Sequence, residues 1–319
     1  MSSKNKKNHS TKSVFCIWIT FLSLVQTACG NDIQKAVSAF DGQRAFTYLE
    51  KQCEFGPRVP GTQAHQACLQ FLTSELKSFG AQVSLQNFTR PLATNNHKNV
   101  TMTNVIASFA VNKGKRILLC AHWDTRPWAD QDTVAENQNK PILGANDGAS
   151  GVAVLLEVAR VLQEFAAPFG VDIILFDGED SGLPGNDESY ALGSQFFARN
   201  KDFRYRPALG ILLDMVGDKN LQIYKEENSI KYAPHIVDRV WQKAQALGLN
   251  SFIPTAGYQV TDDHLPLLKS GIPCIDIIDF DYEHWHTLQD TPDKCSAESL
   301  KEIGTLILGL IYDEALFEQ

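Results

Sequence analysis

The sequence is short of positive charge and of long apolar segments, and each shortage excludes a class of protein. Its 29 lysines and arginines are outnumbered by 37 aspartates and glutamates, which gives a formal net charge of -8 at pH 7. A nucleic-acid-binding protein needs a basic face, so we expect no nucleic-acid partner. After residue 30, no apolar run is long enough to span a membrane.

Linkers, internal repeats and low-complexity tracts are also missing between residues 31 and 319. A chain of this length with 44% hydrophobic residues can bury one large core. We therefore predict a single domain over residues 30–319. No pattern in the sequence reports an oligomeric state, and a monomer is the default expectation.

The first 29 residues differ from the rest and predict a signal peptide. "MSSKNKKNHSTK" is basic, and a short apolar core with small residues before Cys29 follows it. Thr27-Ala28-Cys29 also resembles the end of a bacterial lipobox, in which the cysteine carries a lipid, although Gln26 fits that motif poorly. We predict an exported protein of the bacterial cell envelope, with a lipid on Cys29 as its membrane contact. Simple secretion and an uncleaved anchor remain alternatives.

Cysteines are few and follow no zinc-knuckle spacing. Export permits disulfides, but an odd number of cysteines after Cys29 leaves their pairing open. Cys120 and Cys274 lie in apolar, strand-like runs, which indicates buried thiols. The cysteines that follow Cys29 are Cys53, Cys68, Cys120, Cys274 and Cys295.

Apolar strands alternate with helical patterns along most of the chain. Helices are predicted around 33–53, 62–79, 147–165, 192–200, 234–247, 263–270 and 296–316. Strands are predicted at 81–90, 99–110, 116–124, 171–176, 208–216, 221–225, 251–254 and 272–278, with a hairpin turn at 112–115. This alternation predicts an α/β fold, a three-layer α/β/α sandwich around a mostly parallel mixed sheet.

Acids and histidines follow the strands of this predicted sheet at one edge. Any one of them alone would be ordinary turn chemistry, but together they indicate a site where loops leave the carboxyl ends of the strands. Mixed carboxylate and imidazole ligands suit Zn²⁺, which keeps one position open for chemistry. The residues are His122, Asp124, Asp147, Glu179, Asp180, Asp214 and His286.

The motifs "AHWDT", "GANDGASGVAVLLEVAR", "FDGED", "LLDMVGD" and "HWHTLQDT" resemble the zinc-site motifs of the M28 peptidase clan. The resemblance covers roughly residues 45–319 and implies a zinc-aminopeptidase-like fold. Within the clan, the run "TDDHLPLL", Trp285 before the ligand histidine and "FDGED" resemble the glutaminyl cyclases. The resemblance therefore implies a zinc-dependent catalytic domain.

Carried over residue by residue, the resemblance implies one zinc ion held by Asp147, Asp180 and His286. Asp180 is shorter than the glutamate that cyclases carry there. His122 and Asp214 match positions that hold a second zinc in two-metal aminopeptidases, so the sequence leaves the metal count open.

The same resemblance implies that Glu179 is the acid/base and that Asp214 and Asp262 are supporting hydrogen-bonding acids. Trp285 becomes an apolar wall of the substrate pocket. Asp276 stands where animal cyclases carry a histidine, and this difference puts the site role of its strand in doubt.

The resemblance implies one of two reactions. As a glutaminyl-peptide cyclotransferase, the protein converts N-terminal glutamine of peptides or proteins to pyroglutamate and releases ammonia. As a two-zinc M28 aminopeptidase, it removes N-terminal residues and Glu179 deprotonates a metal-bound water. We favour the cyclase. The polar loop 127–143 is predicted to border the mouth of the site, with a solvated loop as the alternative.

Overall fold

The computed structural model describes residues 34–317, so the predicted signal peptide and Cys29 lie outside the described residues. A six-stranded sheet forms the middle layer, in the order β1-β2-β4-β3-β5-β8. Its strands are β1 (Gln82–Leu92), β2 (Lys98–Phe109), β3 (Arg116–His122), β4 (Gly170–Phe176), β5 (Leu209–Asp214) and β8 (Cys274–Ile278). β6 (Ile223–Lys225) and β7 (Phe252–Ala256) form a separate parallel pair.

The pairing confirms a mixed sheet. β4, β3, β5 and β8 run parallel, whereas β2 is antiparallel to both β1 and β4. The predicted hairpin between residues 99–110 and 116–124 is wrong, because β4 lies between β2 and β3 and pairs with both. The turn "NKGK" looks the same in sequence whether the strands beside it are neighbours or are separated by a third strand.

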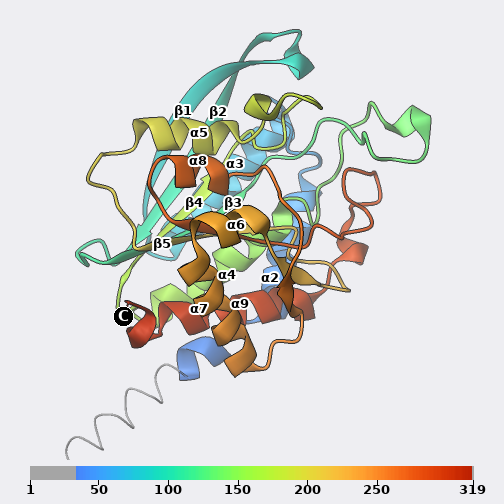
Figure 1. The fold of residues 1–319 in the computed structure, drawn as a ribbon. Helices are drawn as coiled ribbons and strands as arrows, with labels where there is room; N and C mark the ends of the chain where they lie inside the picture. The colour runs from blue at the N-terminus through green and yellow to red at the C-terminus, as the bar shows by residue number, and fades with distance from the viewer. Residues whose placement is uncertain (1–33, 318–319) are drawn as a thin grey trace, which may run out of the picture.

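Helices cover both faces of the sheet and confirm the three layers (Figure 1). On one face α2, α4 and α9 pack on one another, with α3 against α4 and α7 against α9. On the other face α5 and α8 pack with each other, and α6 contacts α7 and β8. The α-helices are α2 (Gly42–Glu54), α3 (Gln63–Ser78), α4 (Ala149–Glu164), α5 (Leu192–Asn200), α6 (Glu227–Tyr232), α7 (Pro234–Leu247), α8 (His264–Lys269) and α9 (Ala297–Ile311). Short 3-10 helices lie at Ala93–Asn95, Ala135–Asn137, Asp187–Ser189, Pro292–Lys294 and Glu314–Phe317.

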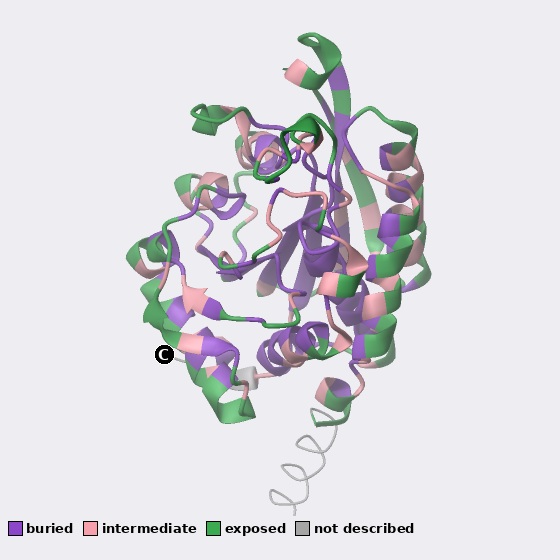
Figure 2. Ribbon diagram, turned by 90° about the vertical axis from the view of Figure 1, so that its right-hand side faces the viewer, coloured by how far each residue is buried: buried purple, intermediate pink, exposed green. Residues whose placement is uncertain are grey.

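Side-chain alternation along the strands builds two cores. In β3, Ile117 and Leu119 face the larger helix layer, whereas Leu118 and Cys120 face α5 and α8. Figure 2 shows the strands of the sheet buried between helices that are exposed on their outer sides. The five cysteines of the described residues are free and buried, which confirms the expectation for Cys120 and Cys274.

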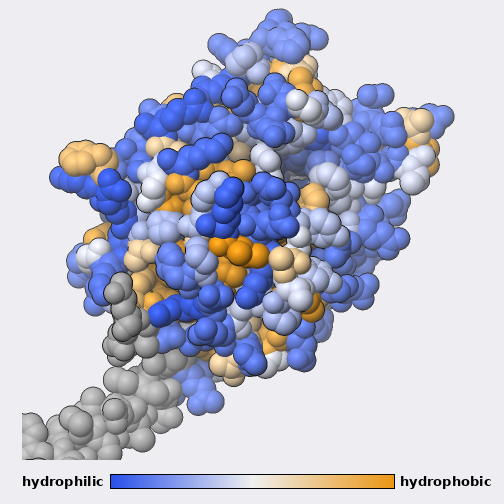
Figure 3. Space-filling model, viewed as in Figure 1, coloured by the Kyte–Doolittle hydropathy of each residue, from blue (hydrophilic) through white to orange (hydrophobic). Residues whose placement is uncertain are grey.

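The surface agrees with the acidic, polar composition. The face in Figure 3 is largely hydrophilic, with apolar side chains in patches near the middle of the view. Within residues 34–317, no helix combines the length and the apolar character needed to cross a membrane.

Two glycines let α4 approach the sheet closely enough to place the residues at its start. A Cβ on Gly148 would lie 2.4 Å from the imidazole of His122, and one on Gly151 would lie 2.3 Å from the carbonyl oxygen of Leu213. Real Cβ atoms do not approach other atoms so closely, so glycine is required at both positions. As a result, Asp147 lies next to the ends of β3 and β5.

Candidate active site

The structure brings the predicted site residues together at the carboxyl edge of the sheet. His122 ends β3, Asp214 ends β5, and Glu179 and Asp180 follow β4. Asp147 precedes α4, and His286 lies in the segment after β8. Parallel strands that end at one edge explain why residues so distant in sequence meet there.

Asp147, Asp180 and His286 form what we call the metal-ligand cluster. Nε2 of His286 lies 3.6 Å from Oδ2 of Asp147 and 3.4 Å from Oδ1 of Asp180. One ligand atom from each residue lies within 4.8 Å of the others, and all three residues are buried. Oδ2 of Asp180 is buried without a hydrogen-bond partner. Two carboxylates and an imidazole are a ligand set that fits a zinc ion with one open position.

Two further carboxylates hold the backbone that carries these ligands. Asp124 accepts hydrogen bonds from the backbone N–H groups of Glu179, at 3.0 Å, and of Asp180, at 3.3 Å. Asp290 accepts from the N–H groups of Asn146 and Asp147 in the same way, at 2.8 and 3.1 Å. Asp290 was not singled out from the sequence, because only the folded chain brings its loop to α4.

A buried arginine and the loop 127–143 also support the cluster. Arg126 donates to Oδ1 of Asp180 at 3.1 Å and pairs with Asp130 at 2.6 Å, and Asp130 lies 3.2 Å from Nδ1 of His286. Burial opposes a positive charge on His286, but Asp180 and Asp130 outweigh it and raise the pKa of His286 to about 9. Sequence reasoning missed both Arg126 and Asp130, since an arginine has no predictable place beside a cation site.

The backbone of His286 is itself unusual. Its φ is +54°, in the left-handed region that non-glycine residues seldom adopt. The N–H of Gln131, in the loop 127–143, donates to the carbonyl of His286 at 3.2 Å and helps to hold this conformation. Such conformations gather at functional sites, where the surrounding structure imposes them.

His122, Asp147 and Asp214 form a second candidate ligand group. Nε2 of His122 lies 3.1 Å from Oδ1 of Asp147 and 3.1 Å from Oδ1 of Asp214. Asp147 therefore belongs to both groups, as a bridging carboxylate in a two-metal site would. Burial disfavours a charged His122, but its carboxylate neighbours prevail and raise its pKa well above the usual value.

Glu179, Asp214 and Asp262 are linked through their charges. Burial raises the pKa of Glu179 well above its usual value, and the charges of Asp262 and Asp180 add to the shift. Burial and the charge of Asp214 raise the pKa of Asp262 to about 6. Acids whose environment favours the protonated form near neutral pH are suited to proton transfer.

Behind Asp262 lies a buried group that the sequence did not predict, which we call the His264 cluster: Asp262, Asp263, His264 and Asp276. All four are at most 3% exposed. Nδ1 of His264 lies 3.7 Å from Oδ2 of Asp276. Asp262, His264 and Asp276 could also hold a metal ion. Asp276, whose role the sequence left in doubt, thus lies next to Asp262.

Trp285, the predicted apolar wall, lies against His286. Its ring stacks on the imidazole of His286, with centroids 3.9 Å apart, and it packs against Phe280 at 5.3 Å. Met215 and Tyr282 belong to the same apolar cluster. The partly exposed indole therefore covers one side of the metal-ligand cluster.

A mixed α/β sheet with overlapping carboxylate–histidine groups at its carboxyl edge defines an α/β enzyme with a candidate metal centre. The family model of peptidase family M28 matches residues 104–311, and the chain belongs to that family.

Solved structures show the same fold. A glutaminyl cyclase of Bacteroides thetaiotaomicron, bound to N-acetylhistamine, is 42% identical, with a TM-score of 0.83, over 86% of this chain and 98% of that one. A zinc-dependent exopeptidase of Parabacteroides distasonis is 41% identical, with a TM-score of 0.83, over 86% of this chain and 99% of that one. The two descriptions repeat the choice between reactions that the sequence leaves open.

Among curated proteins, a glutaminyl-peptide cyclotransferase-like protein of Bos taurus is 24% identical over 262 residues. The match covers 73% of this chain and 66% of the bovine protein. The family model, the solved structures and the curated relatives thus agree on the family and the fold of this chain.

Proposed function

We propose that this chain is a zinc-dependent glutaminyl-peptide cyclotransferase that converts N-terminal glutamine of peptides or proteins to pyroglutamate. In this reaction the α-amine of the glutamine attacks its own γ-amide carbon. A carbon–nitrogen bond closes the five-membered ring, the bond to the amide nitrogen breaks, and ammonia leaves. No water and no other reactant is consumed.

The proposed proton carrier is Glu179. Its carboxylate takes a proton from the attacking amine and returns it to the departing nitrogen. Asp262 and Asp214 lie close enough for their charges to act on this group of acids, so they hold the substrate amine and keep a proton within reach. Trp285 excludes water, which would otherwise hydrolyse the amide to glutamate.

Asp147, Asp180 and His286 are the proposed zinc ligands, and the unpartnered oxygen of Asp180 supports this assignment. When bound, zinc supplies a Lewis acid that polarises the γ-carbonyl and stabilises negative charge on its oxygen. One zinc ion is expected for a cyclase.

The observation that carries the proposal is the 42% identity to two glutaminyl cyclases of known structure, each over 86% of this chain. The buried acids Glu179, Asp262 and Asp214 fit the proton transfers of the reaction, in which a proton leaves an amine and reaches a departing nitrogen. An aminopeptidase also delivers a proton to its leaving nitrogen, so these acids serve either reaction.

The second candidate is a two-zinc aminopeptidase. One specific observation favours it: His122 lies 3.1 Å from both Asp147 and Asp214, so a second ligand group shares the bridging Asp147. In that enzyme, Glu179 would act as the base toward water, and the product would be a shortened peptide.

A single assay separates the two reactions. The purified protein is incubated with a peptide that begins with glutamine, and ammonia, free glutamine and peptide mass are measured on a sample of known zinc content. We expect release of ammonia and a product peptide whose mass is lower by one ammonia. The protein sample should contain one zinc ion per chain. Release of free glutamine together with two zinc ions would instead establish the aminopeptidase.

A further inference from the structure

A large pocket opens between α5 and α8, next to the proposed catalytic acids. Its volume is about 840 Å³, within the range of pockets that enclose whole ligands. Asp262 lines it directly. The N–H groups of Ala191 and Leu192, which also line it, donate to the carbonyls of Glu179 and Gly178 at 2.9 and 3.2 Å. The pocket is therefore joined to the proposed reaction site through Asp262 and through residues bonded to the loop of Glu179.

Three cations line this pocket without carboxylate partners: Arg90, Arg199 and Lys269. Within residues 34–317, Arg199 donates only to Gln195, at 3.1 and 2.5 Å, and Arg90 lies over the rings of Phe88 and Phe196 while its guanidinium donates to a backbone carbonyl. Lys269, also part of the described chain, is exposed and pairs with no acid. Since none of the three is paired with a carboxylate within the described residues, their charges remain available to a ligand of the pocket.

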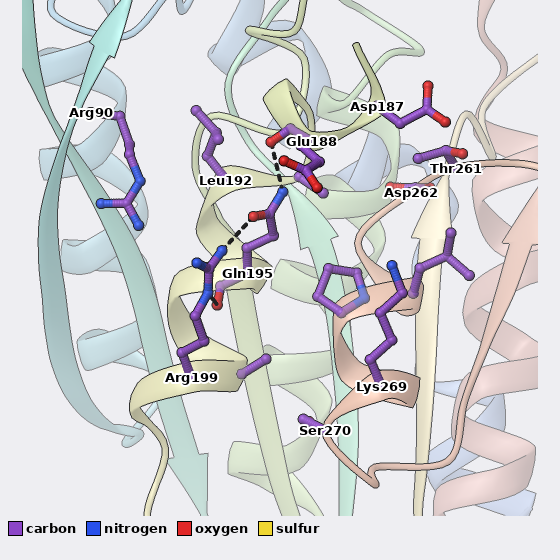
Figure 4. Close-up of a pocket in the computed structure, with 14 residues that line it drawn as sticks. Arg90, Asp187, Glu188, Leu192, Gln195, Arg199, Thr261, Asp262, Lys269 and Ser270 are labelled. Atoms are coloured by element: carbon purple, nitrogen blue, oxygen red, sulfur yellow. Dashed lines mark hydrogen bonds between the residues drawn. The ribbon is translucent and has the colours of Figure 1, made fainter.

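The charges of the pocket are unevenly distributed. In Figure 4, Asp187, Glu188 and Arg90 are labelled in the upper part of the view, and Arg199 and Lys269 in the lower part. Asp187 and Glu188 precede α5 and Asp262 precedes α8, whereas Arg199 and Lys269 lie in the last turns of these helices. The two acids thus lie at the end of the pocket that is nearest the catalytic acids, and Arg199 and Lys269 lie farther along the two helices. A peptide with a positive amine at its first residue and negative charge a few residues later matches this order.

The length of α5 sets the distance between the two ends. Leu192 is bonded to the loop of Glu179, and Arg199 follows it seven positions later in the helix. At about 1.5 Å per residue this is roughly 10 Å of helix. An extended peptide covers about 3.3 Å per residue, so the basic end lies opposite roughly the third to fifth residue of a bound substrate.

We propose that the pocket between α5 and α8 binds the chain that follows the N-terminal glutamine and selects peptides with acidic residues near positions three to five. This inference rests on the proposed function and names the substrate class of the same site. Charge complementarity at an exposed surface gives modest selection and a strong dependence on salt.

The test compares three peptides that begin with glutamine and differ only at the fourth residue, which is aspartate, alanine or lysine. We expect kcat/KM to fall in that order, with about a tenfold range at low salt. The range should shrink to about twofold when the ionic strength is raised to roughly 1 M, where the screening length is about 3 Å.

Two variants assign the selection to the pocket. In Arg199→Gln combined with Lys269→Gln, the ratio of kcat/KM for the aspartate and lysine peptides should fall to near one. The matched control is Lys113→Gln, an exposed lysine in the loop before β3, at the opposite edge of the sheet, which should keep the wild-type ratio.

The outcomes separate the inference from the function on which it rests. Equal rates on all three peptides, or an unchanged ratio in the double variant, would overturn the inference and leave the cyclase intact. Absence of ammonia release from even the alanine peptide would overturn the proposed function and the inference with it.

Discussion

The metal-ligand cluster and the His264 cluster both bury several acids near the carboxyl edge of one sheet. They differ in the hydrogen-bond donors and cations that surround these acids. In the metal-ligand cluster, Arg126 and His286 contact Asp180, and backbone N–H groups anchor the loops on Asp124 and Asp290. In the His264 cluster, both carboxyl oxygens of Asp276 and both ring nitrogens of His264 lack hydrogen-bond partners.

This difference shows two ways to tolerate buried carboxyl groups. Donors and cations surround the first group and lower the cost of negative charge, which suits ligands for a metal. In the second, burial raises the pKa of Asp276 and Asp263 well above the usual value, and the charge of Asp262 adds to each shift. The second group therefore favours protonated carboxyls. Glu179 lies between the two and is affected by both.

The largest expected effect on catalysis comes from replacing Glu179, which the charges of both clusters affect. Glu179→Gln keeps the size of the side chain but cannot carry a proton between the two nitrogens. We expect kcat for ammonia release to fall by about 10²–10⁴-fold, the usual contribution of a general acid/base. Zinc content and the thermal unfolding midpoint should stay at wild-type values, because Glu179 is not one of the proposed ligands.

The matched control for this change is Glu283→Gln, an exposed carboxylate three residues before His286, which should leave kcat unchanged. Retained turnover in Glu179→Gln would assign the proton transfer to another acid. Loss of zinc from it would place Glu179 inside the metal-ligand cluster and end the distinction between the two regions.

A second pair of variants tests which histidine binds metal. His286→Ala removes one of three proposed ligands and leaves two carboxylates facing each other, so we expect the protein to lose its zinc on dialysis. His122→Ala removes a ligand of the alternative group only and should keep one zinc per chain. Elemental analysis of the dialysed proteins measures both.

Equal metal loss from both variants would favour a two-zinc site bridged by Asp147. Zinc content unchanged in both would exclude either histidine as a required ligand and would point to the third candidate group, around His264. Circular dichroism on the same samples shows whether each variant is folded.

Much of this architecture can be predicted from the sequence, because local patterns specify it. The period of apolar residues predicted α4 and α7, and the strand ends predicted that Asp147, Asp180 and His286 would meet. The order of the strands could not be predicted in this way: "NKGK" indicated a hairpin, yet β4 separates the two strands.

The residues that support the metal-ligand cluster could not be predicted from local sequence patterns either. Arg126, Asp130 and Asp290 act across loops that only the complete fold brings together. Helix α6 was not predicted, because its six residues have no apolar period and its start depends on a buried glutamate, Glu226. Glu226 also lies 3.3 Å from Nε2 of His264, so it links the start of α6 to the His264 cluster.

The smallest expected effect concerns this glutamate and the pH dependence of stability. Burial opposes its charge, but His264 and backbone N–H groups outweigh burial and lower the pKa of Glu226 to about 2. A folded-state pKa below the unfolded value means that ionised Glu226 stabilises the fold above about pH 4.5. This stabilisation is lost as the pH falls toward 2.

Glu226→Gln should therefore lower the thermal unfolding midpoint by roughly 2–4 °C at pH 7, the effect of a lost helix cap of about 1 kcal/mol. The gap to wild type should narrow at pH 3, since this carboxyl is then protonated in the unfolded state and folding has to remove the proton. Glu227→Gln, at the exposed neighbouring position of α6, should show no gap at either pH. A gap of the same size at both pH values would mean that Glu226 acts through hydrogen bonds alone and that its charge does not stabilise the fold.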